Sequence, residues 1–226
     1  MLLRSFAIAL LALPLTAATA LAHHPLGGAT PATFGEGLLS GIGHPILGFD
    51  HLAFVIAAGL IAATLRSKTA ALLPLAYLAA MAVGLILHVS GVMLPAAEWV
   101  ITLSVLLLGL LVARGKVMGA TTLAGLFALA GLFHGFAFAE AIIGAEPTPL
   151  VAYIVGLVGA QYAIALAAFA VARLAIGAAE ATPVGIRIAG GVIAGVGLTF
   201  FLEGVEGAVF SDMQSAGLLL SLPVFG

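Results

Sequence analysis

The chain has 226 residues, of which 63% are hydrophobic and 7% are charged, and its formal net charge is −2. Because soluble domains carry about 25% charged residues, this composition predicts an all-α integral membrane protein, a bundle of about six transmembrane helices. No basic patch is present, which excludes a nucleic-acid partner. Cysteine is absent, which excludes disulfides, iron–sulfur clusters, thiolate zinc sites and cysteine nucleophiles, so a metal site must use other ligands.

Residues 1–22 have the pattern of a secretory signal peptide. Arg4 supplies the positive end, residues 6–15 the apolar centre, and residues 20–22 a small-residue cleavage site. The alternative interpretation is a first membrane span that is not cleaved.

Residues 23–43 are expected to form an extracytoplasmic N-terminal segment rich in glycine, proline and threonine. His23 and His24 at its start either pick up metal ions or belong to a disordered leader. The stretch 34–42 is too short to span a bilayer, so it either lies at the outer surface or dips into the protein.

The first span is predicted to begin directly after this segment. Gly41 and Gly43 are expected to break the chain. His44 then occupies the helix cap and Pro45 the first turn, where the missing N–H of proline has no cost.

Six apolar stretches are long enough to cross a bilayer, and together they predict a six-helix transmembrane domain over residues 44–206. An apolar extracytoplasmic tail, residues 207–226, follows this domain. The predicted spans are 45–65, 70–91, 98–113, 118–143, 150–173 and 185–204.

The charged residues of the predicted loops sort by side. The basic residues that follow the signal peptide all fall on one side, and they are Arg66, Lys68, Arg114, Lys116, Arg173 and Arg187. The acids on the other side are Glu36, Glu98, Glu146, Glu206 and Asp212. Because cytoplasmic loops carry the excess of lysine and arginine, this pattern predicts that both termini lie on the outer side of the membrane, which for a bacterial cytoplasmic membrane is the periplasmic side.

The polar stretch at the start of the first span contains His44, Asp50 and His51. An ionised carboxylate inside hydrocarbon costs about 2.5–3.5 kcal/mol, and the basic residues within the predicted spans, Arg173 and Arg187, stand at the cytoplasmic ends, away from Asp50. Its partner is therefore a proton, a hydrogen-bond donor or a bound cation, and the imidazoles point to a transition metal. One continuous helix would place His44 and His51 about 10 Å apart on one face, too far to share an ion directly.

A second group of polar residues lies in the fourth span and near the outer end of the second. His134 and Glu140 belong to the fourth span, and His88 to the second. All the membrane-associated histidines and acids fall in the outer half, which favours an ion pathway over scattered structural groups. The structural alternatives are a hydrogen-bonded pair for Asp50 and His51, a packing role for His134, and solvated side chains for Glu140 and His88.

The two groups share a pattern that suggests an inverted three-plus-three repeat, because spans one and four run in opposite directions. In both, Gly-x-x-His is followed six residues later by an acid: Gly41, His44, Asp50 and Gly131, His134, Glu140. The predicted depths disagree, since one histidine starts its helix and the other lies two thirds of the way along.

With these residues in hand, the chain resembles the HupE/UreJ family of bacterial nickel/cobalt permeases over nearly its whole length. The segment 44–51, His-Pro-x-x-Gly-x-Asp-His, looks like the first-span signature of the family, and 133–140 looks like its second. The segment 144–150, which leads to Tyr153 and Gln161, is also similar. Phe138 stands where many members have a second histidine. The resemblance implies that the residues of metal recognition or passage are His44, Asp50, His51, His134 and Glu140.

The sequence therefore predicts a secondary permease, not an enzyme, that imports nickel or cobalt as a transported ion and holds no tightly bound cofactor. Its partners are the lipid bilayer and a divalent metal ion. No ATP is used, because no P-loop motif is present. A homo-oligomer is left open. Two rival functions are a membrane-embedded zinc hydrolase with Glu140 as base, and a b-haem electron carrier with His51 and His134 as axial ligands.

Overall fold

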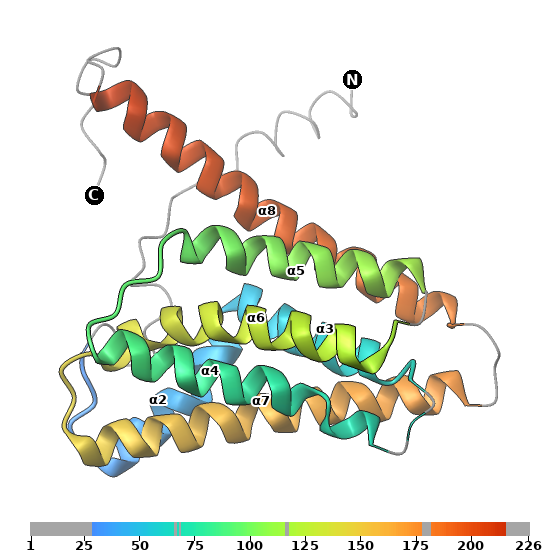
Figure 1. Ribbon diagram of the computed structural model, residues 1–226, viewed down its shortest axis with the longest axis horizontal. Coiled ribbons are helices and arrows are strands. Elements are labelled where there is room, and N and C mark those ends of the chain that lie inside the picture. Colours follow the sequence, from blue (N-terminus) through green and yellow to red (C-terminus); the bar gives the residue numbers. More distant parts are fainter. Residues whose placement is uncertain (1–28, 66, 68, 116–117, 178–181, 216–226) are drawn as a thin grey trace, which may run out of the picture.

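The computed structural model describes residues 29–65, 67, 69–115, 118–177 and 182–215. All regular structure in these residues is helical, which confirms the all-α membrane bundle. The α-helices are α2 Phe34–Leu47, α3 Phe49–Ala62, α4 Pro74–Val89, α5 Ala97–Arg114, α6 Ala120–Phe138, α7 Pro147–Ile176 and α8 Val184–Ser215, and the 3-10 helices are η2 Ala70–Leu72 and η3 Ala139–Ile142. Helices α4, α5, α6 and α7 run roughly along one direction, while α8 crosses them at an angle (Figure 1). The predicted signal peptide lies outside the described residues.

Five helical segments in the described part of the chain are long and apolar enough to cross a membrane, as predicted for spans two to six. The sixth candidate span is the pair α2 and α3, which is bent by 80°. The last helix, α8, has 32 residues and would be about 48 Å long, which exceeds the roughly 30 Å hydrocarbon core. It continues past the predicted domain boundary at residue 206.

The first span differs from the prediction because its helix starts at Phe34, ten residues before His44. Thr33 and Glu36 form a capping box: the Thr33 hydroxyl accepts the Glu36 N–H, and the Glu36 carboxylate accepts the Thr33 N–H. The predicted break at Gly41 and Gly43 is therefore wrong. A Cβ added at Gly41 would overlap the Tyr153 carbonyl, so this glycine serves close packing of α2 on α7 instead of ending the helix.

The chain breaks at Gly48, which has extended dihedrals of φ −81° and ψ 98° between α2 and α3. Pro45, in the last turn of α2, cannot donate a helical hydrogen bond and so weakens that turn. A Cβ added at Gly48 would lie 2.8 Å from His51 Cδ2, so only glycine leaves room for this imidazole. The predicted placement of His44 at a helix start is corrected: it lies in the last turn of α2.

Glycines bring the other helix pairs into backbone contact. A Cβ at Gly131 would overlap the Tyr77 carbonyl, and one at Gly135 would overlap the Met81 carbonyl, so α4 and α6 pack without side chains between them. Gly109 makes the same kind of contact with Ala194 between α5 and α8. Three tightly packed pairs, α2 with α7, α4 with α6, and α5 with α8, form the bundle.

This pairing is the one that an inverted three-plus-three repeat would produce. Exchanging the two halves converts α2 on α7 into α6 on α4, and the matching glycines Gly41 and Gly131 both pack on a tyrosine carbonyl. The predicted disagreement in depth disappears, because His44 lies in the last turn of α2 and not at its start. The repeat itself stays a prediction.

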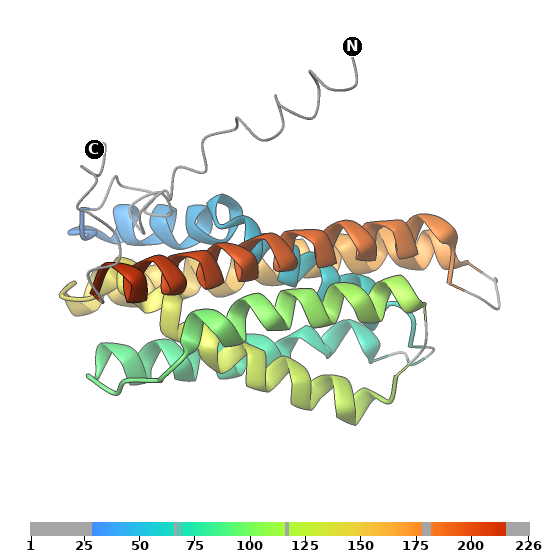
Figure 2. The same ribbon diagram turned by 90° about the horizontal axis from the view of Figure 1, so that it is seen from above.

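Figure 2 shows that α5 and α7 end, and α8 begins, at the same end of the bundle. The described basic residues belong to these helix ends. Arg173 donates hydrogen bonds to the Ala63 and Leu65 carbonyls beyond the end of α3. Arg187 donates to the Ala113 carbonyl near the end of α5. Glu98 and Glu146 belong to the opposite end, where α5 and α7 begin. This separation agrees with the sidedness that the sequence predicts.

Candidate metal site

The site begins with His44, whose ring is 5% exposed and is held by a hydrogen-bond chain. Tyr153 donates its hydroxyl proton to the Phe138 carbonyl at 2.8 Å, so its oxygen accepts a hydrogen bond from His44 Nδ1 at 2.7 Å. A neutral imidazole carries one N–H, and the lone pair of His44 is therefore on Nε2. Histidines that bind metals typically donate their second ring nitrogen to such a partner.

The bend at Gly48 brings His44 and His51 together. Their ring centroids lie 6.2 Å apart with the planes at 72°. The prediction that the two rings are about 10 Å apart is wrong, because it assumed one continuous helix. The chain turns by 80° between them, so the same seven-residue spacing produces neighbouring rings.

Asp50 lies beside these imidazoles in the first turn of α3. It is half-buried, and its Oδ1 accepts the backbone N–H of His51 at 2.8 Å. The positive end of the helix dipole favours a carboxylate at this position, typically by 0.3–1 kcal/mol. The break therefore brings two imidazoles from two short helices near each other, and it places the Asp50 carboxylate in the first turn after the break.

His134 contacts His51 from α6. Their Nδ1 atoms are 2.9 Å apart, and His134 Nε2 is 3.0 Å from the Ser104 hydroxyl on α5. The ring of His134 is completely buried and lies 4.7 Å from Phe54 between centroids. The predicted partners His51 and His134 thus meet directly.

Gln161 supports the same region from α7. Its side-chain oxygen accepts a hydrogen bond from the Tyr77 hydroxyl at 2.9 Å. The Tyr77 ring packs edge-on against His134 at 5.5 Å. Gln161 therefore links α7 to α4 and holds the aromatic wall of the site.

Two predicted residues occupy other places. Glu140 lies in η3 and its side chain is exposed. His88 is half-buried, donates its Nδ1–H to the Phe136 carbonyl at 2.6 Å, and stacks on the Phe136 ring at 3.7 Å. In the described part of the chain, no three His, Asp or Glu side chains are grouped closely enough to hold a metal ion.

Sequence reasoning missed Ser104, and it noticed Tyr153 only through the family resemblance. The available signal was a hydroxyl in an apolar span, because such a group must find a partner within the bundle. Between Ile101 and Leu111, the residues with polar side chains are Thr102 and Ser104. Which histidine it meets depends on how α5 packs on α6.

Known proteins resemble this chain in sequence. The family described as HupE / UreJ protein matches residues 10–200. The chain is 34% identical over 182 residues to Protein HupE of Rhizobium leguminosarum bv. viciae. The aligned stretch covers 79% of this chain and 92% of that protein. No solved structure matches the chain. The protein therefore belongs to the HupE/UreJ family, whose members are transport-related membrane proteins and not enzymes.

Proposed function

We infer that the protein is a secondary permease that carries Ni²⁺ or Co²⁺ across the bacterial cytoplasmic membrane toward the cytoplasm. The observation that carries this proposal is the break at Gly48, which brings the rings of His44 and His51 to 6.2 Å between centroids inside a bent apolar span, with Asp50 in the first turn of α3. Broken helices at membrane depth are tolerated where they line a binding site or a pathway, and they are frequent in transporters.

The donor set supports a borderline transition metal as the transported ion. Imidazole nitrogen together with carboxylate oxygen is a donor set that suits Ni²⁺ and Co²⁺, whereas Mg²⁺ and Ca²⁺ prefer sites made of oxygen ligands alone. The described residues form no closed group of three ligands. A transported ion must bind weakly enough to leave again, so water or carbonyl oxygen would fill the remaining positions of its coordination shell.

The proposed direction follows from the charges. If the end of the bundle that holds Arg173 and Arg187 faces the cytoplasm, the start of α2 faces the periplasm. A membrane potential that is negative inside supplies about 2.3 kcal/mol per charge per 100 mV, and twice that for a dication. This is enough to drive import with no second ion.

The rival functions have less support. Membership of the HupE/UreJ family argues against the zinc hydrolase. A haem iron with His51 and His134 as axial ligands would need a porphyrin between two rings whose nitrogens are 2.9 Å apart. The direct contact between these imidazoles leaves no space for it.

Uptake of radiolabelled nickel and cobalt by cells that express the chain tests the proposal. We expect saturable uptake above the empty-vector control, competition between the two metals, and a fall when a protonophore collapses the membrane potential. Background uptake of both metals, with the protein inserted in the membrane, would contradict the permease.

Tyr153→Phe should weaken metal uptake, because the hydroxyl that orients His44 is lost. Removal of such an outer-shell partner typically costs 10–100-fold in metal affinity, so we expect at least a tenfold rise in the KM for nickel. Tyr162→Phe on the same helix is the matched control, since its hydroxyl makes only a 3.4 Å contact with the Ala71 carbonyl. Equal KM values in the two variants would rule out an orienting role for Tyr153.

A further inference from the structure

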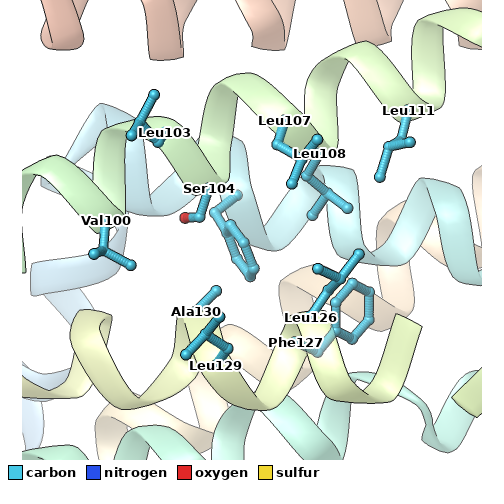
Figure 3. Close-up of a pocket in the computed structure, with 11 residues that line it drawn as sticks. Val100, Leu103, Ser104, Leu107, Leu108, Leu111, Leu126, Phe127, Leu129 and Ala130 are labelled. Carbon is cyan, nitrogen blue, oxygen red and sulfur yellow. The ribbon is translucent and has the colours of Figure 1, made fainter. Parts of the chain in front are cut away.

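Ser104 lies on α5 opposite α6, at the edge of a cavity of about 200 Å³ whose other walls are apolar (Figure 3). Leu103 and Leu107 of α5 and Phe127 and Ala130 of α6 contribute to these walls. The serine hydroxyl is the polar side-chain group of this lining, and it makes two short contacts. These contacts determine which way the hydrogen bonds of the metal site run.

The first contact uses the only proton that Ser104 can donate. Its Oγ lies 2.6 Å from the Ile101 carbonyl, which can only accept, so the hydroxyl donates to it. The Ser104 oxygen must then accept from His134 Nε2 at 3.0 Å. His134 is therefore protonated on Nε2 as a neutral imidazole.

The tautomer of His134 in turn determines the tautomer of His51. With its proton on Nε2, neutral His134 has a bare Nδ1, which can only accept. His51 Nδ1, 2.9 Å away, must be the donor. The lone pair of neutral His51 is consequently on Nε2, the same arrangement that Tyr153 imposes on His44.

We propose that Ser104 is a positioning residue of the metal site: acting through His134, it fixes the tautomer of His51 so that the Nε2 lone pair serves the transported ion. His134 then orients a ligand, and both of its nitrogens are committed to hydrogen bonds. This inference rests on the proposed function, because the ion is the nickel or cobalt of the permease.

Two isosteric variants test the role of the hydroxyl. Ser104→Thr keeps the hydroxyl and Ser104→Val does not, while both add similar bulk that the adjacent cavity can accept. We expect the KM for radiolabelled nickel uptake to stay within about twofold of wild type with threonine, and to rise at least tenfold with valine. The maximal rate should change less than the KM. Equal KM values for the two variants overturn the role of Ser104.

The tautomers themselves give a readout that does not depend on transport. In ¹⁵N spectra of the detergent-purified, histidine-labelled protein without metal, we expect His134 protonated at Nε2 and His51 at Nδ1. His134→Asn and His51→Asn assign the two signals. Ser104→Val should exchange both tautomers together, and Ser104→Thr neither. Wild-type His134 protonated at Nδ1 overturns the proposal.

The two failures are distinguishable. Absence of nickel and cobalt uptake by the wild-type protein overturns the permease and, with it, the metal role of Ser104. Wild-type uptake with identical behaviour of the threonine and valine variants overturns the role of Ser104 alone.

Discussion

Asp50→Asn should lower nickel and cobalt uptake at least about 100-fold at trace metal concentration. The substitution keeps the size of the side chain and an oxygen that can accept the His51 N–H, so the start of α3 is preserved. What it removes is the negative charge beside the two imidazoles. A pair of unit charges 4 Å apart gains about 4 kcal/mol in surroundings of intermediate polarity. Partial exposure of Asp50 reduces this energy to about half, which still corresponds to more than a tenfold change in metal affinity. Because the ion carries two charges, the attraction that is lost is twice as large.

Glu98→Gln is the matched control for Asp50→Asn. Glu98 also lies in the first turn of a membrane helix, α5, but its side chain is exposed. The same loss of one charge there should leave uptake unchanged. Whole-cell uptake at equal membrane levels of both variants measures the difference. If Asp50→Asn transports like wild type, this carboxylate is not on the ion pathway.

Gly135→Val should disrupt the bundle, with a loss of folded protein and of uptake together. A Cβ at this position would lie 2.8 Å from Met81 Cα and would overlap the Met81 carbonyl. Because the clash is with backbone, no side chain can rotate away, and α4 must move off α6. Overpacking costs about 1–3 kcal/mol or more, which corresponds to a fall of roughly 2–12 °C in the melting temperature of a chain this long.

Gly125→Val on the same helix separates this clash from the general effect of adding valine. A Cβ at Gly125 meets nothing within 4 Å, and the residue is exposed. Thermal unfolding of the two variants in detergent should show a loss for position 135 and little change for position 125. Similar melting temperatures would mean that α4 and α6 tolerate separation.

The site explains how a chain of this composition can hold polar groups inside a membrane. Two carbonyls at the end of α6, those of Phe136 and Phe138, accept hydrogen bonds from His88 Nδ1 and from the Tyr153 hydroxyl. A helix end leaves such carbonyls without intrahelical partners, and in a membrane they must be satisfied by side chains. The carbonyl of Phe138 at the end of α6 thus holds the Tyr153 hydroxyl, which in turn orients the His44 imidazole.

The sequence by itself determined the membrane class, the helical architecture and the candidate ligand types. Hydrophobic stretches of about 20 residues and the one-sided basic residues are local features, and they predicted α4 to α7 and the start of α8 closely, whereas α8 continues beyond the predicted end. His44, Asp50 and His51 indicated a functional site in the first span. Carboxylate and imidazole groups are costly in hydrocarbon unless they have a binding partner.

Only the tertiary structure decided how these residues meet. Gly41 looked like a helix breaker, but α7 packs against it and the helix continues, so the break falls at Gly48 instead. The contact of Ser104 with His134, across 30 residues, likewise depends on the rotation of α5 against α6. Helix propensity and periodicity act within one segment. Which glycines mark breaks and which serve packing, and which nitrogen of each imidazole carries the proton, depend on neighbours that are distant in sequence.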